Sequence, residues 1–350
     1  MHHKADPATE KRYPALDGLR ALAVGLVLLL HGTYGQFAGG FVGVDIFFVL
    51  SGFLITSSLR SEYRISGRVS LRAFWLRRAR RLLPAFAMML LLSRLLWGYF
   101  VPPSPPFSRA AASALLYVAN IQAVLDPSKL GALLHTWSLS TEEQFYLFWP
   151  LAATAVLRTA RPSPILLAAL IAAIARGVLF YLGSPAASYF SPLCRIDQLL
   201  IGCALACCVE RLPASGKSVR LVALAFLVAL VWLVLRIDNA WPPFYYGGMT
   251  VFAVGAALLI AALRDETWWL SRIFSKTPLV WVGQRSYGIY LLHFPIFVLL
   301  DQLRTRHSLA NFALVTIARL SITIGLAALS WNFVERPLMR VRRSPDAQAA

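Results

Sequence analysis

Two ionisable side chains interrupt the first apolar segment of the chain, LDGLRALAVGLVLLLHGTYG at residues 16–35. Arg20 precedes His31 by eleven residues, which is about 16 Å along an α-helix. Ionisable groups at membrane depth are costly, so each is a candidate for function. Histidine can act as a general base near neutral pH, and the alternative is an interfacial histidine bonded to a neighbouring carbonyl. The pattern makes His31 a candidate catalytic base.

Acidic residues lie near the start of two other apolar segments. Asp45 lies near the start of GGFVGVDIFFVLSGFLIT, where it could orient His31 as in a catalytic dyad or simply favour the helix start. His135, Glu142 and Glu143 lie in LHTWSLSTEEQFYLFWP. The two glutamates are about 100° apart on a helix, so at most one faces a central site. Alternatively, both belong to an N-terminal cap with acidic residues in the first turn of the helix. We predict that Asp45 or Glu142 lies beside His31.

Two further motifs carry polar groups in apolar surroundings. Arg195 and Asp197 in SPLCRIDQLLIG could pair with each other or bind a polar acceptor. Tyr290 and His293 in SYGIYLLHFP share a helix face at i, i+3, where packing explains His293 equally well. These four residues are candidates for supporting roles.

A run of arginines precedes the third long apolar segment, in FWLRRARRLLPAF. Arginine binds phosphate through paired N–H donors, so the run predicts an anion site. The alternative is that these charges only set membrane topology and contact lipid headgroups. The run contains Arg77, Arg78, Arg80 and Arg81.

Composition defines the class of protein. The 350 residues are 58% hydrophobic with a mean hydropathy of +0.63, whereas a soluble domain lies nearer half apolar. Many apolar runs reach the roughly 20 residues needed to cross a bilayer. We attribute the net charge of +18 to cytoplasmic loops and lipid headgroups, and predict no nucleic-acid partner. The four cysteines lack metal-ligand spacing, and we predict no metal site.

The predicted fold is all-α, a polytopic transmembrane helical bundle of about ten spans with both termini cytoplasmic. A borderline segment at 109–125 is predicted not to span, because this choice places most basic residues on the cytoplasmic side. A re-entrant segment or outer hairpin then covers about 102–134. The predicted domains are a tail at 1–12, a transmembrane domain at 13–337 and a tail at 338–350. The spans are predicted near 16–34, 41–59, 82–101, 135–157, 163–183, 191–210, 219–236, 243–263, 278–300 and 309–333.

Seven motifs in order, from about residue 13 to 337, resemble the acyltransferase-3 family of integral membrane O-acyltransferases. The first is an arginine, ten residues and a histidine, formed by Arg20 and His31. The WSL-x-x-E-x-x-FY block selects Glu142 rather than Glu143. The other motifs are FVGVDIFFVLSGFLI with Asp45, Ser51 and Gly52, RRARRLLPA with Arg77, Arg78, Arg81 and Pro84, then RIDQLLIG, SYGIYLLHFPI and FVERP.

The resemblance implies transfer of an acyl group, commonly acetyl, from cytosolic acyl-coenzyme A to a carbohydrate hydroxyl, with no bound cofactor. Family acceptors include surface polysaccharides, lipopolysaccharide, peptidoglycan, glycolipids and sometimes macrolides. The chain resembles the standalone type, without a C-terminal SGNH-hydrolase-type domain. His31, oriented by Asp45 or Glu142, is the expected base, and a covalent acyl-enzyme step stays open. Expected donor contacts are Arg20, Arg77, Arg78 and Arg81, and expected acceptor or supporting residues are His135, Arg195, Asp197, Tyr290 and His293.

The expected location is the bacterial inner membrane, crossed several times. The expected partners are acyl-coenzyme A, a carbohydrate or glycolipid acceptor and membrane lipids, with glycan-assembly proteins or a second copy of the chain as further candidates. Two other classes stay open. One is a transporter or flippase of a lipid-linked sugar, although no inverted repeat is visible. The other is a non-catalytic partner in a glycan export complex.

Overall fold

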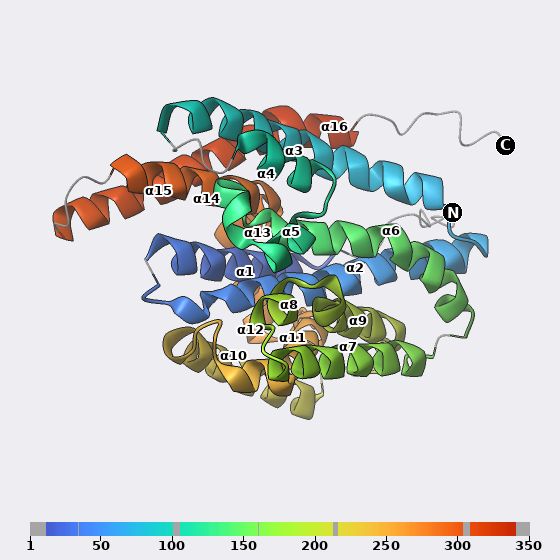
Figure 1. Cartoon of the computed structure of the whole chain (residues 1–350). Helices are drawn as coiled ribbons and strands as arrows, with labels where there is room; N and C mark the ends of the chain where they lie inside the picture. The colour runs from blue at the N-terminus through green and yellow to red at the C-terminus, as the bar shows by residue number, and fades with distance from the viewer. Residues whose placement is uncertain are drawn as a thin grey trace.

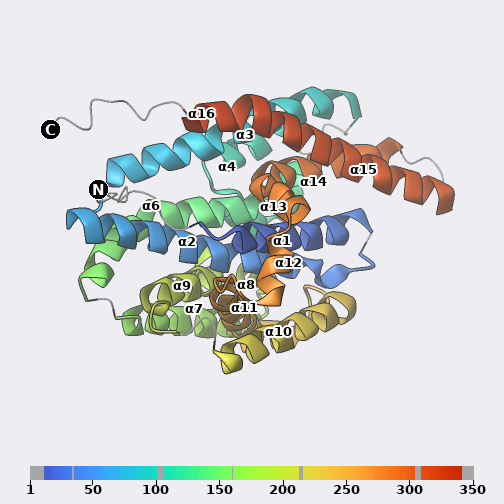
Figure 2. The same cartoon turned by 180° about the vertical axis from the view of Figure 1, so that it is seen from behind.

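The computed structural model describes residues 12–33, 35–100, 106–159, 161–212, 216–303 and 309–340. Over these ranges the chain is helical and contains no strand, in agreement with the predicted all-α class. Most of the long helices run roughly along one direction, and the helices form three groups (Figure 1). Helices α1, α2 and α6 lie between a group containing α3, α14 and α15 and a group containing α7, α9, α10 and α11. Figure 2 shows the same grouping from behind.

The helices follow one another with short connections. Their bounds are α1 (Pro14–Gly32), η1 (Ala38–Phe41), α2 (Val42–Ser66), α3 (Leu71–Phe100), α4 (Phe107–Leu115), α5 (Ala119–Leu125), η2 (Pro127–Leu133), α6 (Thr136–Thr159), α7 (Ser163–Tyr181), α8 (Pro185–Phe190), α9 (Pro192–Cys208), α10 (Lys217–Arg236), η3 (Phe244–Gly248), α11 (Met249–Leu263), α12 (Trp269–Phe274), α13 (Thr277–Gln284), α14 (Ser286–Leu303), α15 (Leu309–Ser330), η4 (Trp331–Glu335) and α16 (Arg336–Arg340).

Seven helical segments of the described chain are long and apolar enough to cross a membrane, which makes this a multi-pass membrane protein. The three other predicted spans correspond to α3, α6 and α14. Helices α3 and α6 carry the arginine run and the two glutamates, and the apolar part of α14 is shorter. The seven segments are Pro14–Gly32, Ala38–Ser66, Ser163–Tyr181, Pro185–Cys208, Lys217–Arg236, Phe244–Leu263 and Phe312–Met339.

Two predicted segments differ in detail from the structure. The span expected at 278–300 is broken at Arg285 into α13 and α14. Helix α13 lies directly against α1, because a Cβ on Gly283 would fall 1.7 Å from the Asp17 carbonyl oxygen. The described part of the expected 102–134 hairpin forms three short helices of at most nine residues, about 14 Å, too short to span.

Helices α2 and α9 touch through their backbones at two reciprocal glycines. A Cβ on Gly52 of α2 would lie 1.9 Å from the Leu199 carbonyl oxygen, and one on Gly202 of α9 would lie 2.1 Å from that of Val49. Small residues allow such close approach between membrane helices. The contact fixes the relative position of Asp45 on α2 and Arg195 on α9, which the site depends on.

This packing predicts that Gly52→Ala destabilises the protein by about 1–3 kcal/mol, since the added methyl group meets backbone that cannot rotate away. Thermal unfolding in detergent measures the effect. Gly25→Ala is the matched control, because a Cβ at Gly25 meets nothing within 4 Å. Equal unfolding temperatures for the two variants would contradict the close contact.

Candidate active site

His31 lies in the last turn of α1 and is half-buried. Its Nδ1 is 3.1 Å from the carbonyl oxygen of Val27, one helical turn earlier. A carbonyl only accepts hydrogen bonds, so Nδ1 carries the hydrogen and the neutral ring keeps its lone pair on Nε2. The backbone of its own helix therefore fixes the orientation of the His31 ring, a role that the sequence assigned to a carboxylate.

Two other histidines gather around His31. The His293 ring centroid lies 5.1 Å from that of His31 and 5.5 Å from that of His135. His135 donates from Nε2 to the Leu291 carbonyl at 3.0 Å, and His293 donates from Nδ1 to the Tyr290 carbonyl at 2.5 Å. The structure thus brings together His31 and the predicted supporting residues His135 and His293. The described residues contain no cluster of His, Cys, Asp or Glu suited to a metal ion.

Tyr290 ties α14 to the start of α6. Its hydroxyl donates to the His135 carbonyl at 3.0 Å and lies 2.6 Å from Ser138 Oγ. The Tyr290 ring is buried, with its centroid 5.3 Å from that of His293. Both polar partners hold the ring in one position beside the histidines.

Asp45 is not the partner of His31, and this prediction is wrong. Its Oδ1 accepts from Arg195 at 2.6 Å, and neither side chain of this pair is exposed. A guanidinium is the stronger partner for a carboxylate, because the two buried charges compensate each other. Arg195 in turn lies 5.0 Å from the ring of Tyr189 and 5.5 Å from that of Trp137. The pair therefore supports an aromatic wall near the histidines.

Asp197 does not pair with Arg195 either. Its Oδ1 accepts from Arg176 of α7 at 2.9 Å, and its Oδ2 accepts from the Thr250 hydroxyl at 2.7 Å. Arg176 was not among the predicted site residues, although a single arginine in the apolar run IAAIARGVLF was a signal for it. These bonds join α7, α9 and α11, so Asp197 holds these three helices together.

Glu142 lies away from His31 as well. Ser51 of α2 donates to its Oε1 at 2.7 Å. The hydrogen-bond partner of His31 is the Val27 carbonyl rather than this carboxylate. Glu142 lies instead on the wall of a larger cavity that contains the arginines.

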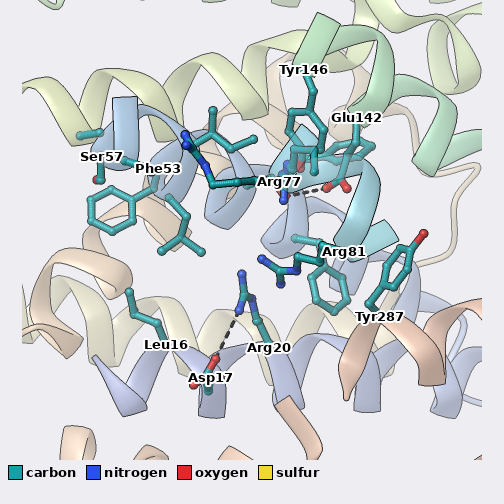
Figure 3. A pocket seen from close by; sticks show the side chains of 18 of the residues that line it. Leu16, Asp17, Arg20, Phe53, Ser57, Arg77, Arg81, Glu142, Tyr146 and Tyr287 are labelled. Atoms are coloured by element: carbon teal, nitrogen blue, oxygen red, sulfur yellow. Dashed lines mark hydrogen bonds and ion pairs between the residues drawn. The ribbon is translucent and has the colours of Figure 1, made fainter. Parts of the chain in front are cut away.

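The larger cavity has a volume of about 760 Å³ and includes all four predicted donor contacts. Figure 3 shows the guanidinium groups of Arg20 and Arg81 pointing into the same open space. Arg20 donates to Asp17 at 3.2 Å, and Arg78 lies 3.9 Å from the ring of Tyr146. The charged residues lining this cavity are Arg12, Arg20, Arg60, Arg64, Arg77, Arg78, Arg81 and Arg264, with Asp17, Glu142, Glu143 and Glu210.

Eight arginines against four acids give this cavity a positive field. Arg60 and Arg64 were not among the predicted donor contacts, but both line this cavity near its exposed mouth. There Glu210 accepts from Arg64 at 2.6 Å and from Arg60 at 2.9 Å. The Arg64 hydrogen bond holds the pKa of Glu210 below its usual value, so this carboxylate stays ionised at the mouth.

A smaller cavity of about 370 Å³ holds His31 and His135. It reaches the surface at the exposed residues Gly35 and Asn239, in the α1–α2 and α10–α11 connections. Val44 and Tyr290 line both cavities, so the two cavities adjoin there. The aromatic residues lining the smaller cavity are Phe41, Trp137, Tyr189, Phe190, Tyr290 and Phe294.

These features define a multi-pass helical membrane protein with a basic cavity and an aromatic, histidine-containing cavity in contact. Residues 13–331 match the Acyltransferase domain of the acyltransferase-3 type, and the chain belongs to this family. No solved structure matches the chain.

Curated relatives cover nearly the whole chain. It is 37% identical to YrhL of Bacillus subtilis over 97% of its length, and 34% identical to the peptidoglycan O-acetyltransferase OatA of Listeria monocytogenes over 95%. It is 32% identical to the O-acetyltransferase OatA of Staphylococcus aureus over 93%. The chain spans about half the length of these relatives, 56%, 56% and 57% respectively.

The buried ion pair of Asp45 and Arg195 predicts that Asp45→Ala destabilises the protein by about 3–5 kcal/mol. The substitution leaves the Arg195 charge buried without its carboxylate. Denaturation in detergent measures the loss, with the exposed Asp238→Ala as control. An inactive Asp45→Ala variant that is as stable as the control would instead favour a direct catalytic role for Asp45.

Proposed function

We propose that this protein is an O-acyltransferase of the bacterial cytoplasmic membrane. It transfers an acetyl group from acetyl-coenzyme A to a hydroxyl of a cell-wall carbohydrate. The observation that carries the proposal is the pair of cavities with unlike chemistry, which adjoin at Val44 and Tyr290 beside the His31 site.

The larger cavity suits the donor. Coenzyme A carries a pyrophosphate and a 3′-phosphate, and arginine binds phosphate through paired N–H donors. Arg20, Arg78 and Arg81 lie deep in the cavity, where their mutual repulsion favours a bound anion. Basic residues concentrate on the cytoplasmic side of membrane proteins, so this cavity opens to the cytoplasm, where coenzyme A is found.

The smaller cavity suits a sugar. Aromatic side chains present an apolar face to a sugar ring, while His31, His135 and Asn239 offer polar groups to its hydroxyls. Peptidoglycan appears in the name of the Listeria relative, which supports a cell-wall glycan as acceptor. Arg195 acts here through the aromatic wall, because Asp45 and the rings of Tyr189 and Trp137 surround it.

His31 performs the proton transfer in this mechanism. Its Nε2 takes the proton from the acceptor hydroxyl as the oxygen attacks the thioester carbonyl carbon. The tetrahedral intermediate then collapses, the carbon–sulfur bond breaks, and the imidazolium returns the proton to the departing thiolate. One acetyl ester and one free thiol result, with no net change in protons.

His31→Ala and His31→Gln are expected to lower acetyl transfer at least about 100-fold, because both remove the base. Glutamine can still donate to the Val27 carbonyl, so this variant separates the base from the hydrogen bond. The assay mixes purified protein with labelled acetyl-coenzyme A and soluble peptidoglycan fragments and detects the ester by mass spectrometry. Normal ester formation by a folded His31→Gln variant would overturn this role, and sugar translocation by wild type without ester formation would favour a transporter.

Arg81→Ala is expected to raise the KM for acetyl-coenzyme A by roughly tenfold or more, with a smaller effect on kcat, because a charged hydrogen bond is worth about 1.5–3 kcal/mol. Arg80→Ala is the matched control, since Arg80 is exposed on the same helix and does not line the cavity. Steady-state kinetics of coenzyme A release measure both. A fall in kcat with an unchanged KM would count against donor binding.

A further inference from the structure

The two cavities adjoin at a defined wall. Among the residues lining either cavity, Val44 of α2 and Tyr290 of α14 face both, and each side chain is only 7% exposed. The arginines lie on one side of this wall and His31 on the other. An acyl group that enters with its thioester from the arginine side must reach the hydroxyl beside His31 through this wall.

The Tyr290 side of the wall is held in place. Its hydroxyl contacts both the His135 carbonyl and Ser138 Oγ, so rotating the ring away breaks two buried hydrogen bonds. The Phe47 ring packs edge-on against Tyr290, with 6.3 Å between the ring centroids. Phe47 itself lines the larger cavity and closes the wall on that side.

The Val44 side is equally constrained. Valine is β-branched and keeps essentially one rotamer in a helix, so its methyl groups have a fixed direction. The next residue, Asp45, is paired with Arg195, and α2 is packed backbone to backbone on α9 at Gly52. Neither the side chain nor the helix of Val44 can move aside at low cost.

We propose that Val44 and Tyr290 form a constriction that selects the length of the transferred acyl group. The inference rests on the proposed function and adds a determinant of donor specificity to it. In this arrangement the leading end of the acyl group points toward the smaller cavity, and we expect an acetyl group to pass the constriction. Each further methylene meets the methyl groups of Val44 or takes space that the acceptor needs.

The test varies Val44 and the donor together. Purified wild type, Val44→Ala and Val44→Ile are assayed with acetyl-, propionyl- and butyryl-coenzyme A and soluble peptidoglycan fragments. One methylene in a tight pocket changes kcat/KM by roughly 10–200-fold. We expect Val44→Ala to raise the propionyl-to-acetyl ratio of kcat/KM about tenfold or more, and Val44→Ile to lower it.

Val42→Ala is the matched control. Val42 is fully buried on the same helix but lines neither cavity, so its truncation loosens packing without widening the constriction. A change of chain-length preference in Val44 variants alone supports the proposal. An unchanged preference in both Val44 variants, or the same shift in Val42→Ala, overturns it while wild-type acetyl transfer leaves the proposed function standing. Absence of acetyl transfer by wild type overturns both.

Discussion

The guanidinium of Arg195 lies between the carboxylate of Asp45 and the rings of Tyr189 and Trp137, with none of its surface exposed. In an apolar bundle such a charge must be compensated internally, because lipid offers no hydrogen bonds. A second buried pair, Arg176 with Asp197, joins α7 to α9. The two pairs join α9 to α2 and to α7, and α2 contributes Val44, Phe47 and Ser51 to the cavity walls.

The two cavities differ in the charge and polarity of the side chains that line them. One side concentrates guanidinium groups, which suits phosphate, and the other combines aromatic rings with neutral imidazoles, which suits a sugar. The His31 hydrogen is fixed by the Val27 carbonyl, a dipole rather than a charge. In the proposed mechanism the His31 ring is thus oriented without a carboxylate.

Hydropathy and charge predicted the helical class and the multi-pass architecture, because both depend on local composition. The motifs also selected four of the eight arginines that line the larger cavity, Arg20, Arg77, Arg78 and Arg81. Which buried charged side chains pair with each other could not be predicted in the same way. Asp45 and Arg195 are 150 residues apart, and only the packing of α2 on α9 shows that they meet. The break at Arg285 lies where α13 packs against α1, a contact that hydropathy does not show.

In the proposed mechanism, the tautomer of His31 has a consequence for product release. With Nδ1 engaged by the Val27 carbonyl, the neutral ring presents a lone pair to the smaller cavity and so attracts a hydroxyl that can donate to it. An acetyl ester has no hydrogen to donate, and its oxygens face that lone pair unfavourably. Acylation would thus turn a matched ligand into a mismatched one at the reacting position, and turnover would itself drive the modified sugar to leave.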